Sequence, residues 1–307
     1  MMNKLITVII SVYNRKEKLR LALDELLDQT LERNLFNVLV VDNNSIDNPE
    51  DVVNSFLPEM NIQYINEDRQ GLGFVRDIGY KVAQSDYVVF IDDDAFPERN
   101  YLEIIYHIIL NEEPDCICGP IFPYYDSPKP KWFKDSYEVR QYSTKKGYLK
   151  PLDVWSGSNM TWKKEVLNKL GGFNVQMGMT ENKIVGGEDT DLFLRYWQKY
   201  NGPIVYDPEA LVYHWVPEYK MKVSYRLKRS IAEGVTWAKV KPWNGFLDRL
   251  QKSIRMFLEI IVIAMITPLF IVKHAYIQQW LVEDVSRITV RLGRICGALN
   301  IPINLRF

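Results

Sequence analysis

The sequence predicts an α/β protein with a Rossmann-like, doubly wound and mostly parallel sheet, followed by a helical and partly apolar C-terminal extension. Two observations support this prediction. In the first part of the chain, short apolar runs alternate with segments whose apolar residues recur at helical spacing, and such alternation is typical of parallel sheets covered by helices. The apolar runs are also nearly continuous, as expected of strands that are buried on both faces.

Five apolar runs are predicted to be strands, and each of the first four is followed by a predicted helix. The strands are placed at 5–13, 36–42, 61–66, 86–92 and 115–122. The helix after the first strand carries Leu19, Ala22, Leu23, Leu26 and Leu27 on one face, and the later helices are placed at 49–57, 72–84 and 98–110. Apolar residues at this spacing form the buried stripe of a helix that packs on a sheet.

The chain changes character after the fifth strand. Residues 124–150 are rich in Tyr, Lys, Pro and Ser and have no clear period, which predicts a long ordered loop. Beyond them we expect a strand or bend at 154–162, helices at 163–170 and 188–200, and an extended segment at 204–215. We therefore expect one domain over 1–215, with halves 1–123 and 124–215, and a helical region over 216–307.

Charge is unevenly distributed along the chain, although the net charge is only −1. From residue 216 onward there are 15 Lys or Arg and 6 Asp or Glu, so the C-terminal region is basic and the rest is acidic. A basic region favours a phosphate-rich surface, either a membrane or a nucleic acid. The three cysteines, Cys116, Cys118 and Cys296, fit neither a zinc site nor a disulfide framework and indicate reduced thiols in a cytosolic protein.

One stretch of the basic region, residues 256–272, is almost entirely apolar and has basic residues on both sides. It is at the lower length limit for a membrane-spanning helix, and Glu259 and Pro268 disfavour a span. The alternatives are a buried core helix, a short span, or an interfacial helix on an anionic leaflet. We favour attachment to the cytoplasmic face of the membrane over spanning. Nucleic acid is not expected as a partner, because no basic stripe with interleaved aromatic residues is present in the sequence.

Polar side chains follow four of the predicted strands, at the point where each strand ends. They are Tyr13, Asn14 and Arg15; Asp42, Asn43, Asn44 and Ser45; residues 67–71; and Asp92, Asp93 and Asp94. Ligands of open α/β sheets bind beyond the carboxyl ends of the strands. We therefore expect these segments to form one pocket.

The run of three aspartates requires a positive partner, because like charges at this distance destabilise one another. Asp92 and Asp94 are two residues apart, so both point to the same side if the strand geometry continues. Mg²⁺ and Mn²⁺ commonly bind through one or two carboxylates together with substrate phosphates. The sequence thus predicts a divalent cation that is shared with a diphosphate.

A second acidic motif, GGEDTDLFLR, occupies residues 186–195. Its Glu188 and Asp189 open a predicted helix, and the simplest interpretation is that these acids stabilise the helix N-terminus. Beside a metal–diphosphate site, a carboxylate here could instead be the general base that takes a proton from an acceptor hydroxyl.

Together these motifs resemble the family-2 glycosyltransferases of the GT-A fold. The matching segments, in the family's order, are VIISVYNR (8–15), VLVVDNNSID (38–47), GLGFVRDIGY (71–80), VVFIDDDAFP (88–97), WSGSNMTWKKEVLNKLGGFN (155–174) and GGEDTDLFLR (186–195). The resemblance implies a nucleotide-diphospho-sugar donor, Mn²⁺ or Mg²⁺, inversion at the anomeric carbon, and a glycan or lipid-linked acceptor. The Gln-x-x-Arg-Trp motif of processive polymer synthases does not follow Asp189. Transfer of one sugar per encounter is therefore expected, in bacterial cell-surface polysaccharide or glycoconjugate synthesis.

The resemblance also implies roles for individual residues. Donor binding is expected from Tyr13, Asn14, Arg15, Asp42, Arg76, Asp92 and Asp93, with Tyr13 and Asn14 along the nucleoside and Asp42 on the base. The expected metal ligands are Asp92, Asp94 and His214. Asp189 is the expected base with Glu188 beside it to position the acceptor, and Trp155, Gly157, Ser158 and Asn159 are expected on the sugar and acceptor side.

Two other functions are alternatives at the level of sequence. A sugar-phosphate nucleotidyltransferase also has a doubly wound sheet, but it needs a glycine-rich basic loop after the first strand, where this chain has YNRKEKLR (13–20). A non-catalytic sugar-nucleotide or glycan-binding protein is disfavoured because Asp92, Asp94, Glu188 and Asp189 are all intact.

Overall fold

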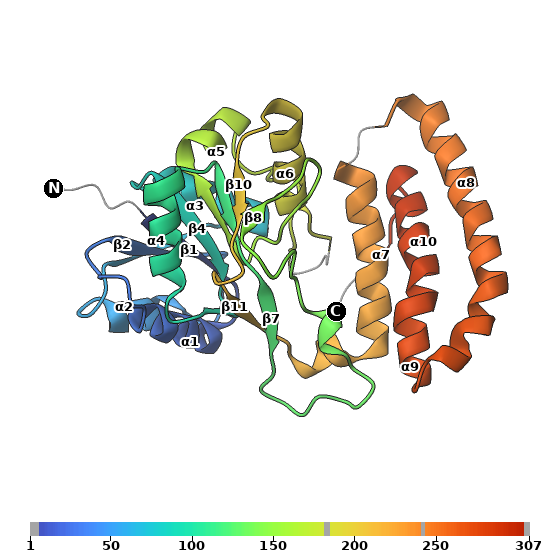
Figure 1. The fold of residues 1–307 in the computed structure, drawn as a ribbon, viewed down its shortest axis with the longest axis horizontal. Helices are drawn as coiled ribbons and strands as arrows, with labels where there is room; N and C mark the ends of the chain where they lie inside the picture. Colours follow the sequence, from blue (N-terminus) through green and yellow to red (C-terminus); the bar gives the residue numbers. More distant parts are fainter. Residues whose placement is uncertain (1–5, 181–184, 241–242, 304–307) are drawn as a thin grey trace. The chain divides into compact units, whose positions relative to one another are not determined.

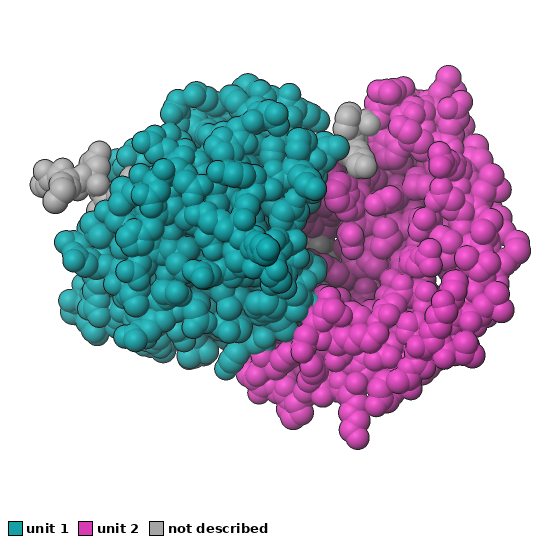
Figure 2. All heavy atoms as spheres, viewed as in Figure 1, with its two compact units in different colours: residues 1–124, 138–176, 188–215 teal, residues 125–137, 177–187, 216–307 magenta. Residues whose placement is uncertain are grey.

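The fold is described from a computed structural model that covers residues 6–180, 185–240 and 243–303. The chain forms two compact units (Figure 2). The first, here called the sheet unit, contains residues 1–124, 138–176 and 188–215. The second, the helical unit, contains residues 216–307 together with 125–137 and 177–187. Two segments that precede residue 216 in sequence thus pack with the C-terminal region.

The sheet unit is built on an eight-stranded sheet with the order β3-β2-β1-β4-β9-β6-β10-β8 (Figure 1). Its first half is parallel: β1 (Ile6–Val12) lies between β2 (Phe36–Asp42) and β4 (Tyr87–Asp92), and β3 (Ile62–Asn66) flanks β2. The connecting helices are α1 (Lys16–Leu27), α2 (Glu50–Phe56), α3 (Leu72–Val82) and α4 (Tyr101–Glu112). The predicted α/β fold with a mostly parallel sheet is therefore confirmed.

The second half of this sheet is mixed. Strand β9 (Met160–Lys163) runs antiparallel between β4 and β6 (Cys116–Cys118). Strand β10 (Ile204–Tyr206) is parallel to β6, and β8 (Gly147–Tyr148) is antiparallel to β10 at the edge. Of the predicted strand or bend at 154–162, only the end is a strand, and the residues before it form the turn described below.

A small three-stranded sheet has the order β5-β11-β7, with β5 at Ala95–Pro97, β11 at Val212–Trp215 and β7 at Ile121–Tyr124. The prediction of a single strand at 115–122 was wrong, because the chain leaves the large sheet at Gly119 and enters the small one. A Cβ at Gly119 would overlap the carbonyl oxygen of Ala210, so only glycine allows the two crossing segments to approach this closely. The predicted extended segment 204–215 divides in the same way, into β10 and β11.

Two apolar cores cover the two faces of the large sheet. One includes Leu19 and Leu23 of α1 and Ile105 of α4. The other lies under α3, α5 (Lys164–Leu170) and α6 (Glu188–Lys199), and includes Trp162 and Tyr196. The central strands β1, β2 and β4 are thus buried on both faces, which explains their nearly continuous apolar runs.

The helical unit contains α7 (Val223–Val240), α8 (Gly245–Ile266), α9 (Ile277–Trp280) and α10 (Ser286–Ala298). Short 3₁₀ segments lie at Asp135–Tyr137, Glu218–Met221 and Thr267–Lys273, and a π-helical turn lies at Leu281–Val285. Helices α7 and α10 pack with their backbones in contact: a Cβ at Gly234 would overlap Val290, and a Cβ at Gly293 would overlap Ile231. Gly297 faces Ala238 further along, so the two helices run parallel (Figure 1).

Candidate active site

The carboxyl ends of the central strands place the predicted donor residues together. The register pairs Ser11 with Asp92 and Val12 with Asp42, so the residues that follow β1 lie between the ends of β2 and β4. The backbone N–H of Tyr13 donates to Asp93 Oδ2 at 3.2 Å. All the contacts described below lie within the sheet unit.

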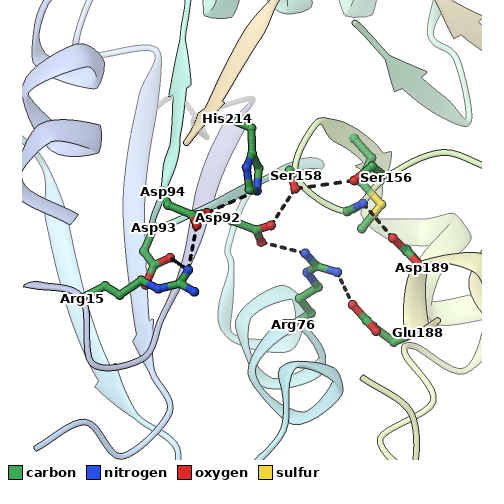
Figure 3. Close-up of polar contacts among 12 residues, drawn as sticks. Arg15, Arg76, Asp92, Asp93, Asp94, Ser156, Ser158, Glu188, Asp189 and His214 are labelled. Atoms are coloured by element: carbon green, nitrogen blue, oxygen red, sulfur yellow. Dashed lines mark hydrogen bonds and ion pairs between the residues drawn. The ribbon is translucent and has the colours of Figure 1, made fainter. Parts of the chain in front are cut away.

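Each of the three consecutive aspartates has its own polar partners (Figure 3). Arg15 donates to Asp93 Oδ1 at 3.2 Å and to Asp94 Oδ2 at 2.8 Å. Asp92 accepts from Arg76 at 2.7 Å and from the hydroxyl of Ser158 at 2.6 Å. The protein therefore supplies two guanidinium groups to this cluster, beyond the metal that the sequence predicted.

Asp93 differs from its neighbours because it is deeply buried. Burial raises the pKa of its carboxyl group to about 7, with Arg15 opposing the rise and Asp94 adding to it. Arg15 and the backbone N–H of Tyr13 are the polar partners of this buried carboxyl group. Asp93 thus helps to hold Arg15 beside Asp94.

His214 reaches this cluster through the small sheet. Strand β11 pairs antiparallel with β5, which begins directly after Asp94, and the register places His214 opposite Ala95. Its Nε2 lies 3.3 Å from Asp94 Oδ1. Its Nδ1 lies 3.1 Å from the carbonyl oxygen of Trp215. Because a carbonyl oxygen can only accept a hydrogen bond, Nδ1 carries the proton and Nε2 faces the aspartates.

Asp92, Asp94 and His214 form the one group of metal-ligand type found among the described residues, with ligand atoms within 4.8 Å of one another. Two carboxylates and an imidazole nitrogen suit Mn²⁺, and the carboxylates alone suit Mg²⁺. The donor set present therefore fits the divalent cation that the sequence predicts.

Arg76 connects this cluster to the second acidic motif. Its guanidinium is 2% exposed and lies between Asp92, at 2.7 Å, and Glu188 at the start of α6, at 2.5 Å. These two acids raise the pKa of Arg76 against the effect of burial, so Arg76 stays charged. Burial raises the pKa of Glu188 to about 7, with Arg76 opposing the rise and Asp189 adding to it. Glu188 Oε2 is buried without a hydrogen-bond partner among the described residues.

Asp189 is held by backbone groups. Its Oδ2 accepts from the N–H of Gly157 at 3.0 Å, and its Oδ1 accepts from the N–H of Thr190 at 2.6 Å. Gly157 packs directly on the guanidinium of Arg76, where a Cβ would overlap it. With Ser158 bonded to Asp92, the turn at 156–158 contacts Asp92, Arg76 and Asp189 together (Figure 3).

Gly157 and Ser158 were predicted to lie on the sugar and acceptor side. In the structure both contact the acids of the site, since Gly157 donates to Asp189 and Ser158 donates to Asp92. The sequence motif marked the turn, but nothing in it indicated that a serine hydroxyl and a glycine N–H would each bond to a different carboxylate. Both contacts join residues far apart in the chain, which local patterns do not reveal.

Asp42 is 2% exposed at the end of β2, and its carboxylate accepts three hydrogen bonds. The donors are the N–H of Ser45 at 3.1 Å, the hydroxyl of Ser45 at 2.5 Å, and the hydroxyl of Tyr64 at 2.7 Å. The N–H of Asn14 in turn donates to Ser45 Oγ at 2.9 Å. Tyr64 was not among the predicted site residues, and Ser45 was expected only as one of the polar residues that follow the second strand.

Two of the residues predicted for the acceptor side donate hydrogen bonds to backbone carbonyl oxygens. Asn159 is 1% exposed, donates to the carbonyl oxygens of Pro120 and Ala210, and accepts from Tyr101. Trp155 donates its indole N–H to the carbonyl oxygen of Gly119 at 2.7 Å. Asn159 therefore holds the chain where it passes between the two sheets, while the half-buried Trp155 keeps part of its ring exposed.

The mixed α/β sheet, with its acids gathered at the carboxyl ends of the strands, agrees with the GT-A fold expected from the sequence. The family model described as glycosyl transferase family 2 matches residues 7–171. Because this match covers more than half of the chain, the protein belongs to glycosyl transferase family 2.

Individual proteins with similar sequences or structures are also glycosyltransferases. A glucosyl-dolichyl phosphate glucuronosyltransferase of Haloferax volcanii is 24% identical over 238 residues, covering 75% of each chain. The mannosyltransferase PcManGT of Pyrobaculum calidifontis, solved with GDP-Man and Mn²⁺, matches with a TM-score of 0.65 and 18% identity, covering 96% of this chain and 88% of its own. TarS 1–349 of S. aureus, solved with UDP-GlcNAc, gives 0.57 and 17%, covering 76% and 66%. At these identities the two structures establish the fold.

Proposed function

We propose that this protein is an inverting, metal-dependent glycosyltransferase. It would move one sugar from a nucleotide-diphospho-sugar to a hydroxyl of a glycan or lipid-linked acceptor at the cytoplasmic face of a membrane, in cell-surface polysaccharide or glycoconjugate synthesis. The observation that carries this proposal is the arrangement around Arg76. A metal-type group lies on one side of this arginine, and a backbone-held carboxylate, Asp189, lies on the other.

The donor would bind across the ends of β1, β2 and β4. Tyr13 and Asn14 would lie along the nucleoside, and Asp42 would contact the base. Asp92, Asp94 and His214 would hold Mn²⁺ or Mg²⁺, which when bound offsets the charge that builds on the leaving diphosphate. Arg15 and Arg76 place two further positive charges beside the same acids.

Asp189 would act as the general base, removing a proton from the acceptor hydroxyl as that oxygen attacks the anomeric carbon from the face opposite the diphosphate. Hydrogen bonds from Gly157 and Thr190 fix the direction of its carboxylate. Glu188 would position the acceptor, because its Oε2 is an acceptor atom without a partner among the described residues.

The names of the related proteins agree with this proposal. PcManGT was solved with GDP-Man and Mn²⁺, and TarS 1–349 with UDP-GlcNAc, so proteins of this fold bind nucleotide sugars. The Haloferax relative is named for glucosyl-dolichyl phosphate, which is a lipid-linked sugar. These names support a nucleotide-sugar donor, a divalent cation and a lipid-linked acceptor here.

The proposal is tested by thermal unfolding with UDP-, GDP- and dTDP-sugars, each with and without Mn²⁺ or Mg²⁺. A donor at about 100 times its dissociation constant should add ~2.7 kcal/mol to the free energy of unfolding. We expect this gain to require the cation and to be lost in Asp94→Asn. Asp135→Asn, a change at an aspartate of the helical unit that pairs with Lys129 on the surface, is the matched control and should keep it.

Transfer to an acceptor extract should stop in EDTA and return with added cation. Full activity in chelator would refute the metal, and the absence of a response to any donor would refute the donor site. Stabilisation by a donor without any transfer would favour a sugar-nucleotide-binding protein.

A further inference from the structure

Helix α8 and the 3₁₀ segment that follows it present an apolar surface to solvent. The segment Gly245–Lys273 is long and apolar enough to cross a membrane by length and composition. Only 11% of its most apolar 18-residue stretch is buried. The outward face, here called the α8 outer face, consists of Leu247 (71% exposed), Ile254 (53%), Leu258 (57%), Val262 (57%), Met265 (69%) and Leu269 (71%). An exposed apolar surface of this length marks an interaction site.

The opposite face of α8 is already occupied. Its buried residues Ser253 and Ile263, with Thr267 just beyond, recur at helical spacing, and α8 packs on α10. Glu259 accepts from Arg291 of α10 at 2.9 Å. The α8 outer face therefore points away from the helix that holds α8 in place.

A strip of charged residues borders the α8 outer face on one side. Asp248, Lys252, Arg255 and Glu259 are spaced by four, three and four residues, so they lie in one row along the helix. Within the row, Lys252 pairs with Asp248 at 2.9 Å and Arg255 with Glu259 at 3.3 Å. A helix with an apolar face beside a charged row has the pattern of an interfacial helix.

We propose that α8 lies in the plane of an anionic lipid bilayer, with the α8 outer face inserted among the acyl chains and the charged row at the headgroups. This deepens the membrane part of the proposed function and can be tested without sugar transfer. A transmembrane orientation would take Glu259 and its partner Arg291 into the hydrocarbon core, where buried charges are expensive. The in-plane orientation leaves both at the surface.

The charges near α8 favour lipid over a second copy of the chain. Between residues 245 and 273 there are four basic and two acidic residues, and α10 has three arginines and no acid. Two copies joined through this surface would bring like charges together, whereas an anionic leaflet attracts them. Trp243 and Trp280 lie just outside the two ends of the segment, and tryptophan is enriched at membrane interfaces.

The test is flotation of the full-length protein with vesicles of phosphatidylcholine, alone or mixed equally with phosphatidylglycerol. We expect binding to the mixed vesicles that weakens in high salt and is released by an alkaline carbonate wash. The triple variant Leu258→Glu/Val262→Glu/Met265→Glu should lower the partition coefficient at least tenfold, which corresponds to about 1.4 kcal/mol. Leu21→Glu/Leu57→Glu/Leu110→Glu, which places the same three charges at exposed leucines of the sheet unit, is the matched control and should bind normally.

Each result bears on the proposal in one direction. Failure of the wild-type protein to float, or equal binding by the triple variant, would overturn it. If the bound protein resists the carbonate wash, α8 spans the membrane instead of lying in its plane. If the protein forms a dimer without lipid and the triple variant is monomeric, the α8 outer face joins two copies of the chain instead. Donor-dependent thermal stabilisation is measured on the same samples. It reports whether the variant is folded, and it separates a failure of lipid binding from a failure of the donor site.

Discussion

The two units of this protein depart from ordinary folding rules in opposite ways. The sheet unit buries charge: Arg76 is 2% exposed and Glu188 is 3% exposed, although isolated charges are expensive to bury. The helical unit exposes apolar surface, with Met265 69% exposed and Leu269 71% exposed. Proteins tolerate such departures mainly where they meet something else. These departures agree with the two proposals above, a polar ligand bound in the sheet unit and a lipid surface contacted by the helical unit.

The largest expected effect concerns the chemistry of the sheet unit. Asp189→Asn keeps the size of the side chain and an oxygen for the Gly157 N–H, but it removes the proposed base. We expect transfer to fall by ~10²–10⁴-fold, the usual contribution of a positioned base. Donor-dependent thermal stabilisation should be unchanged. Initial rates and melting curves on the same preparation check this, and near-normal turnover would remove Asp189 from the role.

Gly157→Ala tests whether the buried charges are rigidly held. The added Cβ would overlap the guanidinium of Arg76, which cannot move away because Asp92 and Glu188 both hold it. We expect a loss of ~1–3 kcal/mol in the free energy of unfolding, as for other overpacked sites, together with a fall in transfer rate.

The matched control for that substitution is Gly147→Ala, where a Cβ meets open space. Denaturant unfolding of both variants gives the comparison. Equal stability in the two would mean that the packing around Arg76 adapts.

Gly293→Ala applies the same change to the helical unit. In an exposed helix this substitution stabilises by ~1 kcal/mol, but here the Cβ would overlap the carbonyl oxygen of Ile231 and separate α7 from α10. We therefore expect Gly293→Ala to destabilise the protein, with a net loss of ~1–3 kcal/mol in the free energy of unfolding. Donor-dependent stabilisation should persist, because the candidate active site lies in the other unit. A gain in stability would show that the helix pair is not close-packed.

The smallest expected effect is a pH dependence. Burial raises the pKa of Glu188 to about 7, so the native state holds a proton that the unfolded state releases near the ordinary glutamate value of 4.5. The stability linked to this group is fully present below pH ~4.5 and is lost as pH rises through ~7. Glu188→Gln does not titrate, so the wild-type protein should lose stability relative to this variant across that window. Melting curves of both proteins at a series of pH values measure the difference. The same pH dependence of stability in the two proteins would contradict the prediction.

Much of the sheet unit could be predicted from sequence because its signals are local. Strands β1, β2 and β4 are nearly continuous apolar runs, and the acids that follow β4 stand next to one another in sequence. Those signals were enough to place Arg15, Asp92, Asp93 and Asp94 at one edge of the sheet. The same local reasoning joined β6 to β7 and β10 to β11, since an extended segment does not reveal which sheet it pairs with.

The contacts that organise the site could not be predicted, because they join distant parts of the chain. Ser158 donates to an aspartate 66 residues earlier, and Arg76 bonds to a glutamate 112 residues later. The short strand β5 could not be predicted from the sequence for the same reason. It consists of three residues, and it is defined by pairing with β11 more than a hundred residues away.

The parallel contact between α7 and α10 has a topological consequence. A chain that leaves the top of one helix can begin a parallel neighbour only after travelling back along the full length of the pair. Helix α8 makes that return, and because the glycines let α7 and α10 touch directly, no room is left for α8 between them. Among the described helices its main packing partner is α10, so one long side remains uncovered whatever its sequence. The fold allows polar or apolar residues on that side, and in this chain the residues are apolar.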